Sequence, residues 1–408
     1  MVFLNSKLAV GIMATYMLAA AATKEGQENG TDAEGCIGKG QNALASAYYP
    51  PNGVCSDFYV PLSLDYEGPE WNASRWNNAF ELQDFLSTAT ASARAGYPLP
   101  LGPMKRFQGN YEIAATFCTP RTPKDGKEKT VIVATHGIGP GREHWNSPYR
   151  PDEFNFVKHS LSKGYSVFFY DRLGCGASSR LDGFEASVFT AKTVLQQLAS
   201  LVRKGKYTGK IKAEKVAVIG FSFGSYATHA AVAEKPEIAD AVIMTGIGFN
   251  TTGINGNGLL RSFVPRIAAL ENPSLFGDRN PGYLTWPSVY DLVMNYFKAP
   301  NFDQDVALYT ESAKQPFSIV EFLTFAGPAE VSADKWDKPA LHITGELDYI
   351  VADGTTKGVI DHPAREIYKN AKPLQISVHP GASHHLNFAR NATGAFEVIT
   401  SFLSQNGV

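Results

Sequence analysis

Short apolar runs alternate with helical patterns through the middle of the chain. Continuous apolar or β-branched runs predict buried strands over residues 130–135, 165–170, 216–219 and 239–245. Apolar residues at helical spacing predict helices between them, over 154–163, 186–204 and 225–233. Strands that alternate with helices indicate βαβ units, and strands without polar alternation fit a parallel sheet that is covered on both faces.

This alternation stops after residue 247 and resumes at residue 336. The segment 248–335 is rich in aromatic residues, and its pattern predicts helices over 259–270, 288–298, 302–313 and 318–325. We expect a helical cap inserted between two strands, because insertions of this kind tend to lie over an active site. A set of ordinary packing helices is the alternative. Strands are then predicted over 339–344 and 374–378, and a final helix over 393–404.

The N-terminal third has a different pattern. Residues 57–66 and 109–120 alternate apolar and polar positions, which predicts strands. Residues 72–96 between them fit a helix or a strand equally well. The polar stretch 121–129 (RTPKDGKEK) predicts the tip of a hairpin, and residues 23–50 have no sustained period and predict a loose arm.

The first residues predict a secretory signal. Lys7 precedes an apolar run, Leu8 to Ala22, which ends in small side chains and is short for a membrane span. A membrane anchor is the alternative, but no later segment of the sequence is apolar enough to cross a bilayer. N-x-[ST] sequons support a secreted glycoprotein, and they lie at Asn29, Asn72, Asn250 and Asn391.

Composition excludes some classes of function. The 37 basic and 39 acidic residues nearly balance, so no basic surface for nucleic acid is expected. Cysteine occurs four times, without a C-x-x-C pair, so a zinc site is not expected. In an oxidising compartment we favour a Cys55–Cys118 disulfide. Cys175 lies in a glycine-rich loop where a small buried thiol fits, and Cys36 remains a competing partner.

The candidate chemistry begins with a G-x-S-x-G sequence, GFSFG, between a predicted strand and a predicted helix. This is the context of a nucleophile elbow, in which a tight turn exposes the serine, here Ser222. Side chains two residues to either side would collide at such a turn, and Gly220 and Gly224 remove them. The pentapeptide alone is weak evidence, so the strand–turn–helix context is what makes Ser222 the candidate nucleophile.

A serine nucleophile needs a histidine to take its proton and a carboxylate to orient that histidine. Asp348 follows the predicted strand 339–344, and His384 follows the strand 374–378. With Ser222, both lie beyond the C-terminal ends of parallel strands, where such sheets place their sites. Glu346 competes with Asp348 for the acid role, and His379 and His385 compete with His384.

The oxyanion that forms in acyl transfer needs two backbone N–H donors. We assign them to Phe223, which follows the nucleophile, and to Ile138, in the loop HGIG after the first core strand. We interpret His136 in that loop as structural, and the turn that begins at Asp171 as a support for the site.

These motifs resemble a known family. HGIG, DRLGCGAS, GFSFGS, GELD and GASHH occur in the order of the α/β-hydrolase superfamily, so residues 130–408 resemble its serine esterases and lipases. THGIGPGREHWNSPYRP and YDRLGCGASS are also similar to a group of secreted fungal α/β-hydrolases without one assigned substrate. The resemblance selects His384 over His385, because the family commonly places its histidine three residues after a glycine, here Gly381. One departure is Phe221, where relatives often have histidine.

We therefore predict an α/β-hydrolase fold, with a mostly parallel sheet, helices on both faces, a helical cap insertion and an N-terminal extension. The predicted organisation is a signal peptide over 1–22, an arm with extra strands over 23–129, a core over 130–247 and 336–408, and a cap over 248–335.

The predicted function is a secreted serine hydrolase that cleaves a carboxylic ester through Ser222, Asp348, His384 and an acyl-enzyme, without metal or cofactor. The expected substrate is a small-molecule or lipid-like ester, with neither nucleic acid nor integral membrane association. Lactone, amide or C–C bond cleavage on the same fold, or a non-catalytic ligand-binding protein, are the alternatives.

Overall fold

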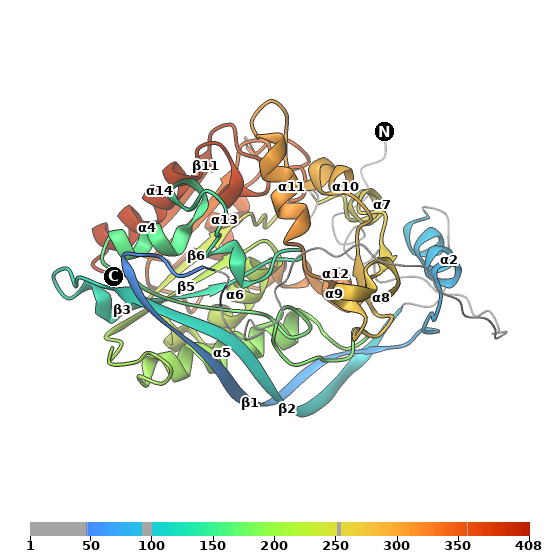
Figure 1. Ribbon diagram of the computed structural model, residues 1–408, viewed down its shortest axis with the longest axis horizontal. Helices are drawn as coiled ribbons and strands as arrows, with labels where there is room; N and C mark the ends of the chain where they lie inside the picture. Colours follow the sequence, from blue (N-terminus) through green and yellow to red (C-terminus); the bar gives the residue numbers. More distant parts are fainter. Residues whose placement is uncertain (1–45, 47, 92–99, 251–253, 357) are drawn as a thin grey trace.

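The computed structural model of the protein describes residues 46, 48–91, 100–250, 254–356 and 358–408. The predicted signal peptide, the sequon at Asn29 and Cys36 lie outside these residues. An eight-stranded sheet forms the centre, with the order β1-β2-β4-β3-β5-β6-β10-β11 (Figure 1). Its strands are β1 (Gly53–Trp71), β2 (Leu101–Pro120), β3 (Thr130–Thr135), β4 (Ser166–Tyr170), β5 (Lys215–Phe221), β6 (Ala241–Thr245), β10 (Ala340–Gly345) and β11 (Leu374–His379).

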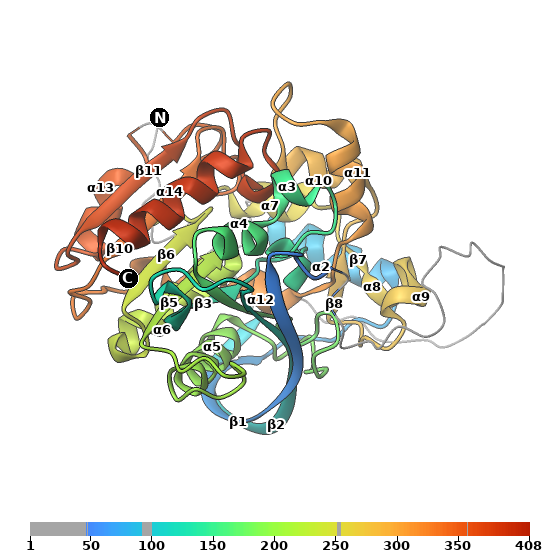
Figure 2. The ribbon, with the colours of Figure 1, turned by 60° about the vertical axis from the view of Figure 1, so that its left-hand side comes forward.

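Neighbouring strands from β4 to β11 are parallel. Every residue of β3, β4, β6 and β10 is buried. Helices α4 (Phe156–Ser162) and α14 (Ala392–Gln405) pack together over one face, and α5 (Val188–Arg203) and α6 (Phe223–Glu234) over the other (Figures 1 and 2). Short helices α3 (Pro151–Phe154) and α13 (Asp361–Ile367) complete the core. The mostly parallel sheet with helices on both faces is therefore confirmed.

The N-terminal strands form a long antiparallel pair at one edge of the sheet. Val60, Leu62, Leu64 and Tyr66 are buried and alternate with exposed residues, as the period-two pattern predicted. The ambiguous stretch after β1 contains a helix, α2 (Ala79–Thr90). The predicted hairpin tip at 121–129 is wrong, because β4 lies between β2 and β3 in the sheet.

Residues 254–335, between β6 and β10, are called the insert below. The insert contains α7 (Gly256–Ser262), α8 (Ala268–Glu271), α9 (Pro273–Phe276), α10 (Val289–Tyr296), α11 (Gln304–Ser312) and α12 (Ile319–Thr324). It also has a small antiparallel sheet that the sequence did not predict, with strands β7 (Arg266–Ile267), β8 (Tyr283–Thr285) and β9 (Phe317–Ser318). Strand β7 divides the predicted helix 259–270. Among the described residues, no helix has the length and apolar character needed to span a membrane.

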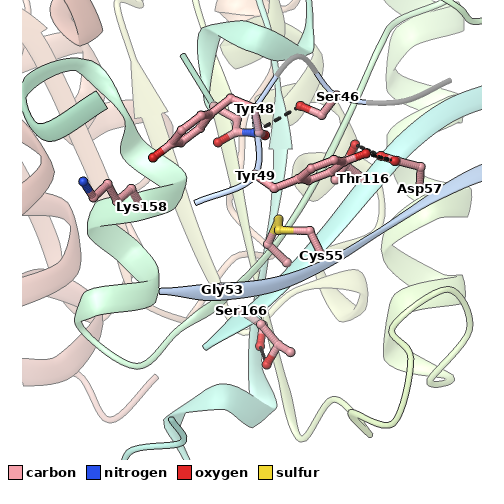
Figure 3. Close-up of a disulfide and its surroundings, with 12 residues drawn as sticks. Ser46, Tyr48, Tyr49, Gly53, Cys55, Asp57, Thr116, Lys158 and Ser166 are labelled. Carbon is pink, nitrogen blue, oxygen red and sulfur yellow. Dashed lines mark hydrogen bonds between the residues drawn. A yellow bond between two sulfur atoms is a disulfide. The ribbon is translucent and has the colours of Figure 1, made fainter. Parts of the chain in front are cut away.

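A disulfide joins the two N-terminal strands. Cys55 and Cys118 are directly paired in the register of β1 and β2, and their sulfurs are bonded (Figure 3). Cys175 is free and buried, and burial raises the pKa of its thiol to about 12, so the thiol is protonated at neutral pH. Both assignments agree with those made from the sequence.

Removal of the disulfide by Cys55→Ala with Cys118→Ala is expected to lower the free energy of unfolding by about 2–4 kcal/mol. The bridge spans a sequence separation of 63, so the unfolded chain gains entropy when the loop is opened. Urea unfolding with and without reductant measures the loss. Cys175→Ala is the matched control, because it removes one sulfur and no cross-link; equal sensitivity of this variant and the double variant to reductant would contradict the assignment.

Candidate active site

Ser222 lies at a strained turn between β5 and α6. Its φ of 53° and ψ of −121° form a combination that residues other than glycine rarely adopt. The neighbouring strand fixes the turn, because the Ser222 N–H donates to the Thr245 carbonyl at 2.9 Å. A Cβ at Gly220 would lie 2.4 Å from the Gly224 carbonyl oxygen, and one at Gly224 would lie 2.3 Å from the Thr135 carbonyl oxygen. Both glycines are therefore required, as the elbow interpretation predicted.

His384 lies between Ser222 and Asp348. Its Nε2 is 2.8 Å from the Ser222 hydroxyl, and its Nδ1 is 2.8 Å from Asp348 Oδ2. The other carboxylate oxygen, Oδ1, accepts the backbone N–H groups of Ile350 and Val351 at 2.9 and 3.1 Å, which fixes the carboxylate. His384 and Asp348 are fully buried, whereas 8% of Ser222 is exposed. The structure thus brings together the three residues that the sequence proposed as a triad.

The competing acid and histidines have other partners. Glu346 Oε2 accepts the N–H of Gly381 at 2.8 Å and so stabilises the turn that precedes His384. His379 Nε2 is 2.8 Å from the carbonyl oxygen of Asn391. His385 Nε2 is 3.2 Å from His144 Nδ1. The geometry therefore favours Asp348 and His384 for the triad roles.

An apolar pocket opens beside Ser222. Both residues assigned to the oxyanion hole line it, and the rest of its wall comes mainly from the insert. The lining residues are Ile138, Ser222, Phe223, Leu259, Phe263, Tyr296, Phe322, Phe325 and Ile350. The Tyr296 hydroxyl donates to the Ile138 carbonyl at 2.6 Å, so α10 of the insert is bonded to the HGIG loop.

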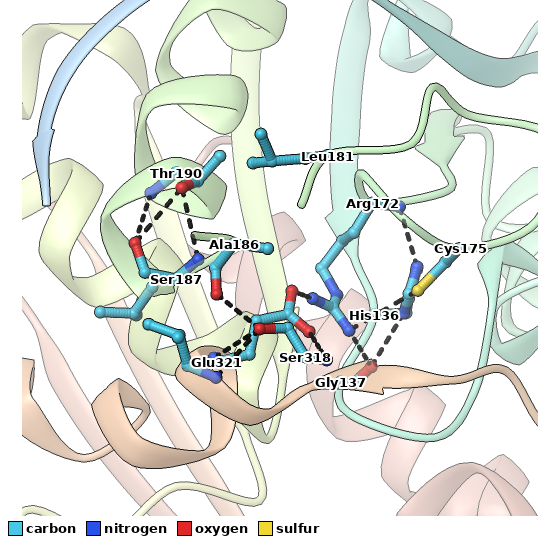
Figure 4. A network of polar contacts seen from close by, with 12 residues as sticks. His136, Gly137, Arg172, Cys175, Leu181, Ala186, Ser187, Thr190, Ser318 and Glu321 are labelled. Atoms are coloured by element: carbon cyan, nitrogen blue, oxygen red, sulfur yellow. Dashed lines mark hydrogen bonds and ion pairs between the residues drawn. The ribbon is translucent and has the colours of Figure 1, made fainter. Parts of the chain in front are cut away.

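A buried ion pair between Arg172 and Glu321 connects the insert to the HGIG loop (Figure 4). Arg172, after β4, pairs with Glu321 of α12, and both side chains are almost fully buried. Nη2 of Arg172 donates to the Gly137 carbonyl at 3.1 Å. The guanidinium carbon also lies 4.5 Å from the centre of the Phe223 ring. One side chain therefore contacts the loop that precedes Ile138 and the residue that follows Ser222.

The two charges of this pair compensate each other. Burial alone would lower the pKa of Arg172, but the Glu321 carboxylate raises it. Burial likewise raises the pKa of Glu321, and the Arg172 guanidinium opposes that rise. Loss of one partner would leave the other buried without a counter-charge, which is more costly than loss of both.

Phe221, which precedes Ser222, packs against a pair of neutral histidines. Its ring is stacked on His144 with 4.3 Å between ring centres, and it lies 5.4 Å from His385. Burial lowers the pKa of His144, and it lowers the pKa of His385 to about 3. Phenylalanine at this position therefore places an aromatic ring, and no further titratable group, next to Ser222.

Sequence reasoning missed Arg172, Glu321 and Tyr296. The motif DRLGCG was interpreted as support only, and Asp171 does act in that way, because its carboxylate accepts the backbone N–H groups of Arg142 and Ala177. The charged Glu321 within the apolar stretch SIVEFLTF was an available signal for a buried ion pair. No signal in the sequence distinguishes Tyr296, since it is one of many aromatic residues in the insert.

The described part of the chain holds no group of three or more His, Cys, Asp or Glu side chains that could bind a metal ion.

Comparison with known proteins identifies the family of this chain. The fold is similar to that of a thermophilic esterase from Thermogutta terrifontis, with 16% identity over 74% of this chain and 96% of that chain and a TM-score of 0.48. The α/β-hydrolase GrgF from Penicillium sp. sh18 is also similar, with 15% identity over 72% of this chain and 94% of that chain and a TM-score of 0.48. A search of curated proteins gives no match. Residues 131–395 match the sequence profile described as "Alpha/beta hydrolase family". Because this match covers most of the chain, the protein belongs to the alpha/beta hydrolase family.

Proposed function

We propose that the protein is a serine hydrolase that cleaves a carboxylic ester through an acyl-enzyme. The observation that supports this most directly is the pair of 2.8 Å contacts that connect Ser222, His384 and Asp348. The same contacts occur at a strained strand-to-helix turn that holds the serine at the wall of an apolar pocket. This combination is the requirement for nucleophilic acyl transfer.

In the proposed mechanism, Ser222 Oγ attacks the ester carbonyl carbon while His384 Nε2 takes the hydroxyl proton. Asp348 stabilises the imidazolium that forms. The N–H groups of Ile138 and Phe223 donate to the oxyanion. When the C–O bond breaks, His384 returns the proton to the leaving alkoxide, and the acyl group remains on Ser222. Water, activated by the same imidazole, then releases the acid and restores the hydroxyl.

The substrate class follows from the pocket. The lining side chains carry two hydroxyl groups, those of Ser222 and Tyr296, and the Tyr296 hydroxyl already donates to the Ile138 carbonyl. The other side chains that line the pocket are hydrocarbon. We infer an ester with a hydrophobic acyl or aryl group, and the same chemistry would open a lactone.

We also propose that the protein is secreted and glycosylated. Asn72 and Asn391, which begin two of the sequons, are exposed, and the Cys55–Cys118 disulfide suits an oxidising compartment. Release of the protein into the medium by cells that express the full chain, together with a mass decrease after glycosidase treatment, tests this.

Ser222→Ala is expected to lower kcat for p-nitrophenyl esters by a factor on the order of 10⁴–10⁶, because the covalent step is lost. A fluorophosphonate should label Ser222 in the wild-type protein and fail to label the variant. Trypsin leaves Ser222 and Ser225 on one peptide, Val216 to Arg261, because it does not cleave between Lys235 and Pro236, so fragment ions must assign the label. Labelling at Ser225, or no turnover of any ester from short to long acyl chains, would contradict the proposal; the second outcome would favour the ligand-binding alternative.

His384→Ala is expected to lower kcat by several orders of magnitude, since Ser222 then lacks its base. His385→Ala is expected to act mainly through KM or stability, because His385 contacts His144 and not the serine. Steady-state kinetics of both variants, with circular dichroism to verify folding, measures this. A folded His384→Ala variant that remains active while His385→Ala is inactive would reverse the assignment.

Arg172→Lys is expected to lower kcat by about ten- to a hundredfold with little change in KM, because a lysine ammonium cannot contact Glu321, Gly137 and the Phe223 ring together. Arg279→Lys is the matched control. Arg279 is also buried, but it donates to the Gly174 carbonyl, outside the oxyanion loops. Both variants should lose stability, and only Arg172→Lys should lose kcat at a temperature where both are folded. Equal losses of kcat in the two would show that Arg172 has a structural role only.

A further inference from the structure

The apolar pocket beside Ser222 is small. Its cavity space is about 20 Å³, whereas one water molecule needs roughly 10–15 Å³. A methyl group is close to a water molecule in size. The space therefore holds the methyl group of an acetyl ester and leaves little room for a longer chain.

The position of the pocket indicates which part of an ester it receives. In the proposed mechanism the leaving alkoxide takes its proton from His384 Nε2, so the alcohol part of the ester must lie beside that imidazole. Ile138 and Phe223, to which the oxyanion donors are assigned, line the pocket, whereas His384 does not. The acyl part of the ester is thus the part that enters this pocket.

Three phenylalanine rings of the insert form a connected part of the pocket wall. The Phe322 ring packs edge to face against the other two, with 6.1 Å between its centre and that of Phe263 and 5.7 Å to that of Phe325. Phe263 in turn stacks on Trp286 with 5.3 Å between ring centres. All three phenylalanines are almost fully buried. Because a ring that turns aside loses these contacts, the wall resists a longer chain.

Helix α12, which carries Phe322, is bonded to the core near both of its ends. The Ser318 hydroxyl donates at 2.6 Å to a backbone carbonyl of the segment that precedes α5, and Thr324 Oγ1 accepts the first backbone N–H of α5 at 3.1 Å. Between them, Glu321 pairs with Arg172 (Figure 4). These contacts hold the Phe322 ring in place at the pocket.

We propose that this pocket restricts the acyl group of the substrate to a short chain, of which acetyl is the type, and that the Phe322 ring sets the limit. The alcohol part lies outside the pocket, so its length is not restricted there. The inference rests on the proposed function, because it concerns the ester that Ser222 would cleave.

Two esters with the same leaving group test the limit. p-Nitrophenyl acetate and p-nitrophenyl hexanoate differ only in the acyl chain. For the wild-type protein, kcat/KM should be at least about tenfold lower for the hexanoate, because the additional methylenes overfill the pocket. An equal or higher kcat/KM for the hexanoate would overturn the proposal.

Variants test the role of Phe322. Phe322→Ala should raise the hexanoate-to-acetate ratio of kcat/KM at least about tenfold, because it removes the ring that limits the chain. Phe317→Ala is the matched control. Phe317 is also buried and lies 6.2 Å from Phe263, against 6.1 Å for Phe322, but it does not line the pocket.

The ratio is independent of the concentration of active protein, so partial unfolding does not change it. If Phe322→Ala does not fold, Phe322→Leu should shift the ratio in the same direction by a smaller factor. An unchanged ratio in a folded Phe322 variant, or an equal shift in Phe317→Ala, would overturn the role of Phe322.

Ethyl acetate and hexyl acetate test which side of the ester enters the pocket, because only the alcohol differs between them. Their kcat/KM ratio should be the same in the wild-type protein and in Phe322→Ala. A shift of this ratio in place of the acyl ratio would overturn the assignment of the acyl group to the pocket.

The same measurements distinguish failure of this inference from failure of the proposed function. Turnover that favours the hexanoate would overturn the chain-length limit and leave the hydrolase proposal intact. Absence of turnover of all four esters, together with no fluorophosphonate labelling of Ser222, would overturn both.

Discussion

The strained backbone of Ser222 is the constraint on which the rest of the site depends. A residue in this region of φ and ψ costs on the order of 1–3 kcal/mol, and it persists only where its surroundings fix it. Here the last residue of β6 does so, because the Thr245 carbonyl accepts from both the Ser222 N–H and the Ser225 hydroxyl. The register that pairs Phe221 with Thr245, and Gly220 with Thr135, therefore determines where Ser222 lies relative to the HGIG loop.

The insert contributes to this arrangement as well as covering it. Glu321 supplies the counter-charge of Arg172, and Tyr296 donates to the Ile138 carbonyl. Each contact reaches the HGIG loop, from which the proposed mechanism takes the Ile138 oxyanion donor. Displacement of the insert would leave the Arg172 charge buried and unpaired, or exposed to water that would weaken its contact with Gly137. The position of the insert and the shape of the proposed oxyanion hole are thus energetically coupled.

The core of the fold and the three triad candidates could be predicted from sequence, because short-range patterns define them. Continuous apolar runs mark β3 to β6, and GFSFG lies between one strand and one helix. The place of β4 between β2 and β3 could not be predicted, since strand order is a long-range property; the polar stretch 121–129 was wrongly expected to form a hairpin tip. Strands of two residues, such as β7, are too short to show a period. The partners of Arg172 and Tyr296 lie more than a hundred residues away in the chain.

Several imidazoles lie close to Ser222, and electrostatics decides which of them can act. A general base must hold a positive charge after it takes the serine proton, and His384 has the Asp348 carboxylate at 2.8 Å to stabilise that charge. His144 and His385 hydrogen-bond to each other, and burial lowers the pKa of both. A second proton on either ring, which would give it a positive charge, is therefore disfavoured. The nearness of His384 lowers the pKa of His385 further, which means that charge on one ring opposes charge on the other. Phe221 lies against both His384 and His385, so His384 is the imidazole beside Ser222 that has a counter-charge.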